Sequence, residues 1–321
     1  MSYVHHRYDT RINIQKNENV KALLPMKTLM KSVLLLLRPH QWVKNLFVFS
    51  PLFFSGQFIQ WDGFYLSIIV FIVYSLAASS IYCFNDIRDI EADKLHPEKC
   101  RRPLASGAVT IKTGYFIMFA LLFFAIVLVC LFLGAVKWKI ISIVGAYYLL
   151  NIAYCMKLKH IAIIDVFIIS IGFVLRVFAG GLATGISISH WIILMTFLLA
   201  LFLAFAKRRD DVATFARTDI KVRPNINRYS LEFINQAISI IAAVTVVCYL
   251  MYTVSVEVTA HFQTSYLYLT AIFVLAGIVR YLQLTIVDAK SGSPTKVLLK
   301  DKFTWLCVIA WIITLSIIIY F

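Results

Sequence analysis

Charged side chains are scarce in this chain, and acidic ones are the scarcest. Only 15% of the 321 residues are charged, and 16 Asp and Glu stand against 31 Lys and Arg. This low charge content, together with 61% hydrophobic residues, excludes an ordinary soluble domain. The six cysteines show no CxxC or CxxH spacing, so we interpret them as small apolar residues and not as a disulfide framework or a metal site.

Long apolar runs make up most of the chain and predict an all-α, polytopic membrane protein. Lipid leaves only helices or closed barrels as spanning structures, and these runs are too long for barrel strands. We predict about nine transmembrane helices around a central cavity that faces the cytoplasm. The first predicted span is shorter than the about 20 residues that a spanning helix needs. The predicted spans are 44–58, 63–84, 115–134, 137–156, 162–184, 190–206, 233–256, 264–284 and 303–321.

The basic residues are distributed unevenly between the two sides of the predicted membrane domain. With the N-terminus in the cytoplasm, 28 of the 31 Lys and Arg lie in cytoplasmic segments, while Lys137 and Lys139 lie on the opposite side. Positive charge marks the cytoplasmic side of membrane proteins. We therefore expect an integral protein of the inner (cytoplasmic) membrane, with N-terminus and active site cytoplasmic. Topology and anionic lipid account for the net charge of +15, and no nucleic-acid partner is expected.

The chain divides into a tail and one membrane domain. Residues 1–27 are polar and basic, and we expect a tail there. Residues 28–321 are predicted to form the membrane domain, which begins with an interfacial helix over 28–38 and carries cytoplasmic loops over 85–114 and 207–232. The sequence leaves the oligomeric state open, a homo-oligomer included.

One motif, NDIRDIEAD, carries the clearest sign of chemistry. It follows the apolar run 64–84 and contains Asn85, Asp86, Asp89 and Asp93. At about 100° per residue, these four side chains fall within about 100° of arc on a helix. Carboxylates this close repel one another unless a cation joins them, and oxygen ligands suit Mg²⁺ bound together with substrate phosphates. We predict Mg²⁺ ligation by all four residues and catalytic roles for the three aspartates. The alternative is a solvated helix end of mixed charge.

Basic residues follow the motif and enter the first predicted span. Arg101 and Arg102 lie in the loop after the aspartates, where they could bind the phosphate oxygens that a metal leaves free. Lys44 and Asn45 could point at an anionic group. The alternatives are loop charge of the cytoplasmic side for the arginines and an interface anchor for the segment from Arg38 to Lys44.

Four further cations are candidates for binding substrate phosphates. Lys159 lies in a short cytoplasmic turn, and Lys207 and Arg208 open the next cytoplasmic loop. Arg176 lies within a predicted span, where an arginine usually faces a cavity or a partner. It lies about 16 Å along the helix from Asp165, so we expect no pairing between the two. A purely structural pair is the alternative for Arg176.

At these residues the chain resembles the UbiA-type prenyltransferase superfamily. Asn85, Asp86, Asp89 and Asp93 match that superfamily's NDxxDxxxD motif. The aromatic-acceptor branch carries a second Asp-rich motif after the sixth helix, and this chain has Lys207-Arg208-Arg209-Asp210-Asp211 there. The stretches RPHQWVKNLFVFSPLFF, NDIRDIEADKLHPEKCRRPLASG, LKH and GFVLRVFAGG look like the polyprenyl-phosphate (decaprenyl-phosphate) phosphoribosyltransferase branch. That branch usually continues the Lys-Arg pair with Tyr-Ala-Glu, and here the chain departs from it.

The resemblance implies a pentosyltransferase. It would move 5-phosphoribosyl from phosphoribosyl diphosphate to a polyprenyl phosphate, in a Mg²⁺-dependent reaction that releases diphosphate and belongs to cell wall biosynthesis. Cations at the second motif suit this reaction, because another carboxylate there would repel the added phosphate. The alternatives are a prenyltransferase with an aromatic acceptor, a transporter and a passive lipid-interaction protein. The chain lacks the second Asp cluster of the first and the internal repeats of the second, and the third leaves NDxxDxxxD unexplained.

Overall fold

The described part of the computed structural model is helical throughout. It covers residues 26–96, 99–218, 225–288 and 300–320, and every regular element in these ranges is an α-helix or a 3₁₀ helix (η). The α-helices are α1 (Met26–Leu37), α2 (Ser50–Phe54), α3 (Trp61–Arg88), α4 (Ile90–Lys94), α5 (Ile111–Phe132), α6 (Lys137–Met156), α7 (Ile164–Thr184), α8 (His190–Thr218), α9 (Leu231–Val254), α10 (Val256–Phe262), α11 (Ala271–Ile286) and α13 (Lys302–Tyr320). The 3₁₀ segments are η1 (Pro39–Phe49), η2 (Lys99–Arg101), η3 (Gly134–Val136), η4 (Leu158–His160), η5 (Ile226–Arg228) and η6 (Tyr266–Thr270).

Eight helices of the described chain are long and apolar enough to cross a membrane, which confirms the predicted fold class. They correspond to the last eight predicted spans, with ends that differ by a few residues except at α8. The first predicted span, 44–58, is not a continuous α-helix. It consists of the end of η1 followed by the short helix α2. Pro39 and Pro51 stand at the starts of these two segments, where a missing backbone N–H does least harm.

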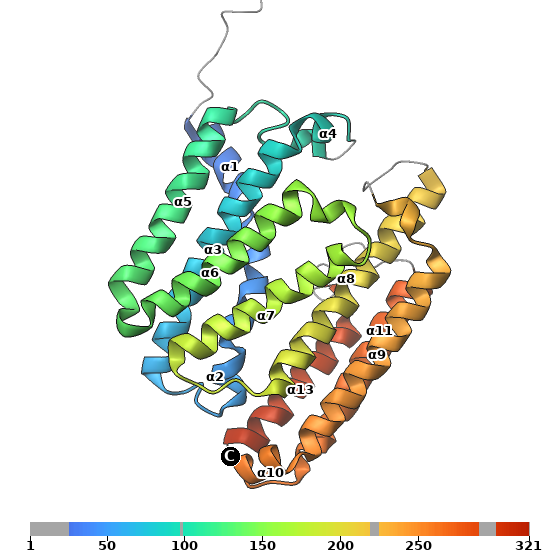
Figure 1. Ribbon diagram of the computed structural model, residues 1–321. Coiled ribbons are helices and arrows are strands. Elements are labelled where there is room, and N and C mark those ends of the chain that lie inside the picture. Colours follow the sequence, from blue (N-terminus) through green and yellow to red (C-terminus); the bar gives the residue numbers. More distant parts are fainter. Residues whose placement is uncertain (1–25, 97–98, 219–224, 289–299, 321) are drawn as a thin grey trace, which may run out of the picture.

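The helices form an elongated bundle, with α5 and α6 at one side, α9, α11 and α13 at the other, and α7 and α8 between (Figure 1). One apolar core joins α3, α5, α6 and α7, and a second joins α7, α8, α9 and α11. Side chains of α5 such as Phe116, Phe119 and Phe123 are exposed. A row of exposed phenylalanines is unfavourable in water and suits lipid, so the protein is an integral membrane protein.

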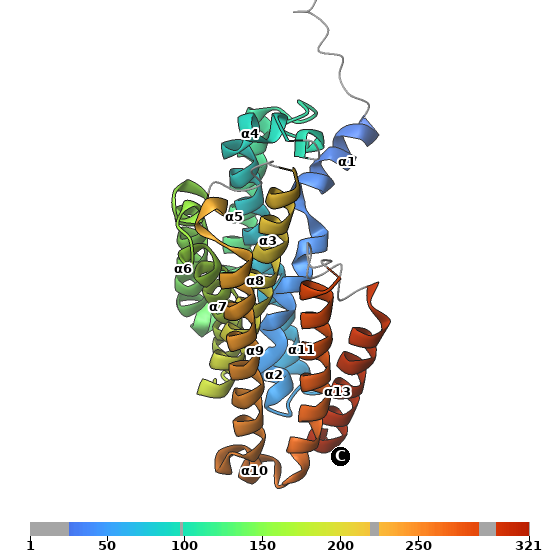
Figure 2. The same ribbon diagram turned by 90° about the vertical axis from the view of Figure 1, so that its right-hand side faces the viewer.

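The segment η1 packs against both α3 and α7. Gly180 of α7 allows this close approach, because a Cβ at this position would overlap the carbonyl oxygen of Val48. In the view turned by 90°, α1 lies beside the α4 end of the bundle (Figure 2). The chain therefore enters from that end and runs through η1 along α3 and α7, with Asn45 and Val48 buried.

Two predicted cytoplasmic loops contain more helix than expected. The helix α8 continues through 207–218, so Lys207 and Arg208 lie on a helix and not in a loop. Residues 85–88 end α3, and residues 90–94 form α4. The predicted interfacial helix is observed as α1. The predicted tail over 1–27 lies outside the described residues, apart from the first two residues of α1.

Candidate active site

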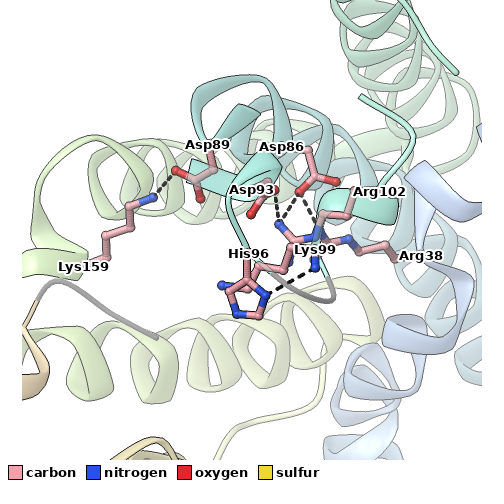
Figure 3. Close-up of polar contacts among 8 residues, drawn as sticks. All are labelled: Arg38, Asp86, Asp89, Asp93, His96, Lys99, Arg102 and Lys159. Carbon is pink, nitrogen blue, oxygen red and sulfur yellow. Dashed lines mark hydrogen bonds and ion pairs between the residues drawn. The ribbon is translucent and has the colours of Figure 1, made fainter. Parts of the chain in front are cut away.

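The helix that carries the aspartate motif breaks in the middle of it. α3 ends at Arg88, and Asp89 has φ −96° and ψ 7°, outside the helical range, before α4 begins at Ile90. The prediction of a single helix face for all three carboxylates is therefore wrong. Asp86 and Asp93 are buried and turn one way, while Asp89 turns the other way (Figure 3).

Two arginines neutralise the first pair of carboxylates. Arg102 uses one nitrogen, Nη1, to contact Asp93 Oδ2 at 2.6 Å and Asp86 Oδ1 at 3.1 Å. Arg38 Nη2 donates to the same oxygen of Asp86 at 2.6 Å. Figure 3 shows both guanidinium groups converging on these aspartates. Both cations are partly exposed, so an incoming anion can reach them.

Lys159 neutralises the remaining carboxylate. Its Nζ lies 2.6 Å from Asp89 Oδ1, and the two residues are 70 positions apart in the sequence. The lysine comes from η4, the turn between α6 and α7. Lys159 is therefore placed beside the aspartate motif, while Asn85, half-buried near the end of α3, supplies an amide next to Asp86.

Two of the three aspartates of the motif are placed so that they could bind a divalent ion. Among the residues that the structure describes, no three His, Cys, Asp or Glu side chains form a cluster that could hold a metal. Asp86 and Asp93 nevertheless share one arginine nitrogen, so their oxygens face a common cation position. Mg²⁺ usually binds through one or two carboxylates together with substrate phosphates. These two aspartates fit that pattern, and Asp89 faces Lys159.

Arg38 is a site residue that sequence reasoning missed, since we predicted it only as an interface anchor. It has φ 52° and ψ 58°, a left-handed conformation that is uncommon outside glycine. Its guanidinium lies 5.0 Å from the ring centroid of Tyr82 in addition to its contact with Asp86. The one available signal was its place between α1 and Pro39, where the chain must change direction.

Arg176 lies deep between η1, α6 and α7. Its Nε donates to Asn45 Oδ1 at 2.7 Å, and its Nη2 donates to the Tyr147 hydroxyl at 2.9 Å. Its Nη1 donates to the carbonyl of Gly172 at 2.6 Å, and the ring of Tyr147 lies 4.7 Å away. Within the described chain, these partners are all neutral, so the buried charge has no carboxylate. The expected lack of pairing with Asp165 is confirmed.

Lys44 and Arg101 differ in burial. Lys44 is half-buried on η1, one residue before Asn45, and therefore lies near Arg176. Arg101 is exposed on η2, beside Arg102. Asn45 is itself held by a hydrogen bond from its Nδ2 to Ser75 Oγ of α3 at 3.0 Å. The asparagine thus fixes the position of the Arg176 guanidinium.

Arg208 is fully buried against carboxylates of its own protein. Its Nε contacts Asp165 Oδ2 at 2.6 Å and its Nη1 contacts Asp211 Oδ2 at 3.1 Å. The Tyr229 hydroxyl donates to the other oxygen of Asp165 at 2.8 Å. Burial raises the pKa of the Tyr229 phenol above its ordinary value, so the hydroxyl stays protonated. Lys207, the preceding residue, is half-buried.

Arg209 is the first residue after the Lys-Arg pair, where the chain departs from the phosphoribosyltransferase branch. Its contacts give it a structural role. It donates to the carbonyls of Thr285 at 2.6 Å and Ile286 at 3.1 Å, and to Asn235 Oδ1 at 2.7 Å. The two carbonyls belong to the last turn of α11, which lacks intrahelical donors. Arg209 therefore joins α8 and α9 to the end of α11.

A known family accounts for this arrangement. The model of the UbiA prenyltransferase family matches residues 46–307. The chain belongs to this family. The match covers the aspartate motif, η4, Arg176 and the Lys-Arg pair, whereas Arg38, Lys44 and Asn45 lie just before the matched range.

Among relatives of this UbiA family member are proteins named decaprenyl-phosphate phosphoribosyltransferase. The one from Mycolicibacterium smegmatis is 34% identical over 92% of this chain and 95% of its own length. The one from Corynebacterium glutamicum is 30% identical over 94% of this chain and 91% of its own length. A digeranylgeranylglyceryl phosphate synthase from Sulfolobus acidocaldarius is also 30% identical, but over only 51% of this chain.

Solved structures share the fold. A UbiA homolog from Archaeoglobus fulgidus bound to DMAPP and Mg²⁺ superposes with a TM-score of 0.66. The two chains are 16% identical, and the match covers 90% of this chain and 99% of the other. At this identity the similarity establishes the fold of the family member described here.

Proposed function

We propose that this UbiA family member transfers 5-phosphoribosyl from phosphoribosyl diphosphate to a polyprenyl phosphate and releases diphosphate. The observation that carries the proposal is the match to decaprenyl-phosphate phosphoribosyltransferases over nearly the full length of both chains. The reaction makes the protein a pentosyltransferase.

The distribution of charge supports a substrate pair with several phosphates. Arg38, Arg102 and Lys159 surround the aspartate motif, and Arg176 lies deeper, with no carboxylate among its described partners. A donor diphosphate, a 5-phosphate and a lipid phosphate together need more cations than one prenyl diphosphate. We assign Arg38, Arg101, Arg102 and Lys159 to the donor. We assign Lys44 and Arg176, held by Asn45, to the acceptor phosphate.

Asp86 and Asp93, with Asn85 beside them, would hold Mg²⁺, and Asp89 would hold Lys159 in place. When bound, the metal would neutralise charge on the departing diphosphate. Arg38 and Arg102 already lie at the aspartates, so they are positioned to bind oxygens of the same diphosphate. Lys207 is half-buried and stays a candidate for a phosphate, whereas Arg208 is engaged by Asp165 and Asp211.

The proposed reaction depends on the positioning of the substrates more than on proton transfer. A phosphate monoester is an anion near neutral pH, so the acceptor needs little help from a general base. The anomeric carbon passes through an oxocarbenium-like state, and attack from the face opposite the diphosphate inverts it. The residues of the site therefore act by holding the anions at the reacting distance and by stabilising the departing charge.

We further propose that the site faces the cytoplasm from the inner membrane and that the N-terminus lies on the same side. The supporting observation is that Lys and Arg gather at the α4 end of the bundle, while the short loops at the opposite end carry Lys137 and Lys139. Phosphoribosyl diphosphate is a highly charged, water-soluble molecule, so a site on the cytoplasmic side would receive it without transport.

Purified protein tests the proposal directly. It is incubated with labelled phosphoribosyl diphosphate and decaprenyl phosphate, with Mg²⁺ or with EDTA, and the label in the lipid phase is counted. We expect label to enter the lipid only with Mg²⁺. A parallel incubation contains a prenyl diphosphate and an aromatic acid, the substrates of the alternative function, a prenyltransferase with an aromatic acceptor. Reaction in this second mixture alone would refute the proposal.

A further inference from the structure

The turn that carries Lys159 ends in a strained residue. Ile163, directly before α7, has φ 72° and ψ −50°. A β-branched residue at positive φ is a backbone outlier, and such outliers persist only where the surroundings impose them. The surroundings of Ile163 therefore indicate what holds this turn in shape.

Tyr229 supplies the contact that holds it. The backbone N–H of Ile163 donates to the Tyr229 hydroxyl at 2.6 Å, across 66 residues of sequence. The same hydroxyl donates to Asp165 Oδ1 at 2.8 Å, and Arg208 holds the other oxygen of Asp165 at 2.6 Å. The phenol thus connects the strained peptide to a buried ion pair on α7 and α8.

The same turn also fixes the position of Lys159 in the candidate active site. Its backbone is closed by hydrogen bonds from the N–H of Ile161 to the carbonyl of Leu158 and from the N–H of Asp165 to the carbonyl of Ile161. Lys159 lies within this closed segment, and its Nζ reaches Asp89 at 2.6 Å. A shift of the backbone at 161–163 would therefore move the ammonium group away from the aspartate.

We propose that Tyr229 is a positioning residue, which acts through the turn 158–163 to place Lys159 against Asp89. The inference rests on the proposed function, in which Lys159 binds a phosphate of the donor. It assigns a role to Tyr229, which makes no hydrogen bond to the three aspartates of the motif within the described chain.

The phenol ring and its hydroxyl have separable roles. The ring packs against Phe205 and Phe233, with centroids 6.4 and 6.3 Å away. The hydroxyl makes both of its hydrogen bonds to the start of α7. Tyr229→Phe therefore keeps the packing and removes only the hydrogen bonds to Ile163 and Asp165. Tyr281→Phe is the matched control, because its buried hydroxyl has no hydrogen-bond partner within the described chain.

Two measurements test the proposal. In the first, amide hydrogen exchange of residues 157–165 is followed in the detergent-solubilised protein, and we expect roughly ten-fold faster exchange in Tyr229→Phe but not in Tyr281→Phe. In the second, kcat/KM for phosphoribosyl diphosphate is measured for Tyr229→Phe alone and combined with Lys159→Met. We expect a roughly ten-fold loss in the first case and less than about two-fold beyond Lys159→Met in the second.

The outcomes separate the inference from the function on which it rests. An equal loss in both backgrounds, or unchanged exchange at 157–165, would overturn the positioning role. If the wild-type protein transfers no phosphoribosyl at all, the proposed function fails, and the exchange measurement still decides whether Tyr229 holds the turn. Faster exchange together with a loss that depends on Lys159 supports the proposal.

Discussion

The three aspartates of the motif and the buried Asp165 all contact cations. Asp86 and Asp93 share Arg102, Asp89 has Lys159, and Asp165 has Arg208. The partners differ in burial, and burial decides what a substitution does. A pair whose cation is partly exposed can exchange its partner for a substrate or a metal, whereas a fully buried pair serves stability.

Asp89→Asn tests the role of the aspartate that faces Lys159. Loss of its charge releases the lysine, and we expect kcat/KM to fall by more than about ten-fold while the protein stays folded. Asp62→Asn, at the opposite end of the same helix and exposed, is the control and should leave activity unchanged. Steady-state kinetics together with a thermal melt measure both effects. Near wild-type turnover in Asp89→Asn would contradict a role for this aspartate in holding Lys159 at the site.

Arg176→Gln tests the assignment of the buried cation to the acceptor. The substitution keeps hydrogen-bonding capacity and removes the charge, so we expect KM for polyprenyl phosphate to rise by about ten-fold or more with KM for the donor little changed. Arg176→Lys should not restore it, because lysine cannot contact both Asn45 and Tyr147 as the planar guanidinium does. Equal KM values for the acceptor in wild type and variant would contradict the assignment.

Arg208→Ala tests the buried pair. The substitution leaves the Asp165 carboxylate buried without its cation, which typically lowers the free energy of unfolding by about 3–5 kcal/mol. Arg217→Ala, an exposed change on the same helix, should alter it by less than about 0.5 kcal/mol. Thermal unfolding in detergent compares the two. Similar midpoints for both variants would show that the pair contributes little.

At the scale of elements, the position of η1 decides where the deeper cations lie. This segment carries Lys44 and Asn45 into the bundle and rests on α7 at Gly180. A 3₁₀ segment has fewer residues per turn than an α-helix and is seldom long, so its packing against neighbours must stabilise it. The bundle therefore holds η1 in place more than its own hydrogen bonds do.

Gly180→Ala should displace η1 because the new Cβ would overlap the carbonyl of Val48. We expect the free energy of unfolding to fall by about 1–3 kcal/mol, as for other overpacked sites, with a loss of activity through Asn45 and Arg176. Gly145→Ala on α6 is the opposite case, since its Cβ would meet nothing within 4 Å. That variant should gain about 0.5–1 kcal/mol from helix propensity. Equal stability of the two variants, measured by thermal unfolding, would contradict the close approach.

For the whole molecule, the charge distribution predicts which end faces the cytoplasm. Single cysteines at Gln60, Ile186 and Ala260 should react with a membrane-impermeant maleimide in intact cells. A cysteine at Ser106, in the segment after the aspartate motif, should react only after the membrane is opened. Cys100, Cys130 and Cys248, the half-buried and exposed natural thiols, are first replaced by serine. Labelling of Ser106→Cys in intact cells would reverse the proposed orientation.

The sequence alone determined the class of fold and the family, and it predicted where the chemistry lies. Runs of about 20 apolar residues can be stable in lipid only as helices, and that requirement is local. The aspartate motif was likewise recognisable, because Asn85, Asp86, Asp89 and Asp93 lie close together along the chain. The family was recognisable from the same residues.

Only the tertiary structure decided which charge meets which. Arg38 lies 48 residues from Asp86, and Lys159 lies 70 residues from Asp89, so helix packing sets both pairs. Their approach also depends on backbone turns, at Arg38 and at Asp89, whose dihedral angles no periodic pattern encodes. Arg208 was expected to bind substrate, and its burial against Asp165 depends on how α7 packs on α8. Contacts between distant residues reflect the energy of the whole bundle, which local sequence patterns do not specify.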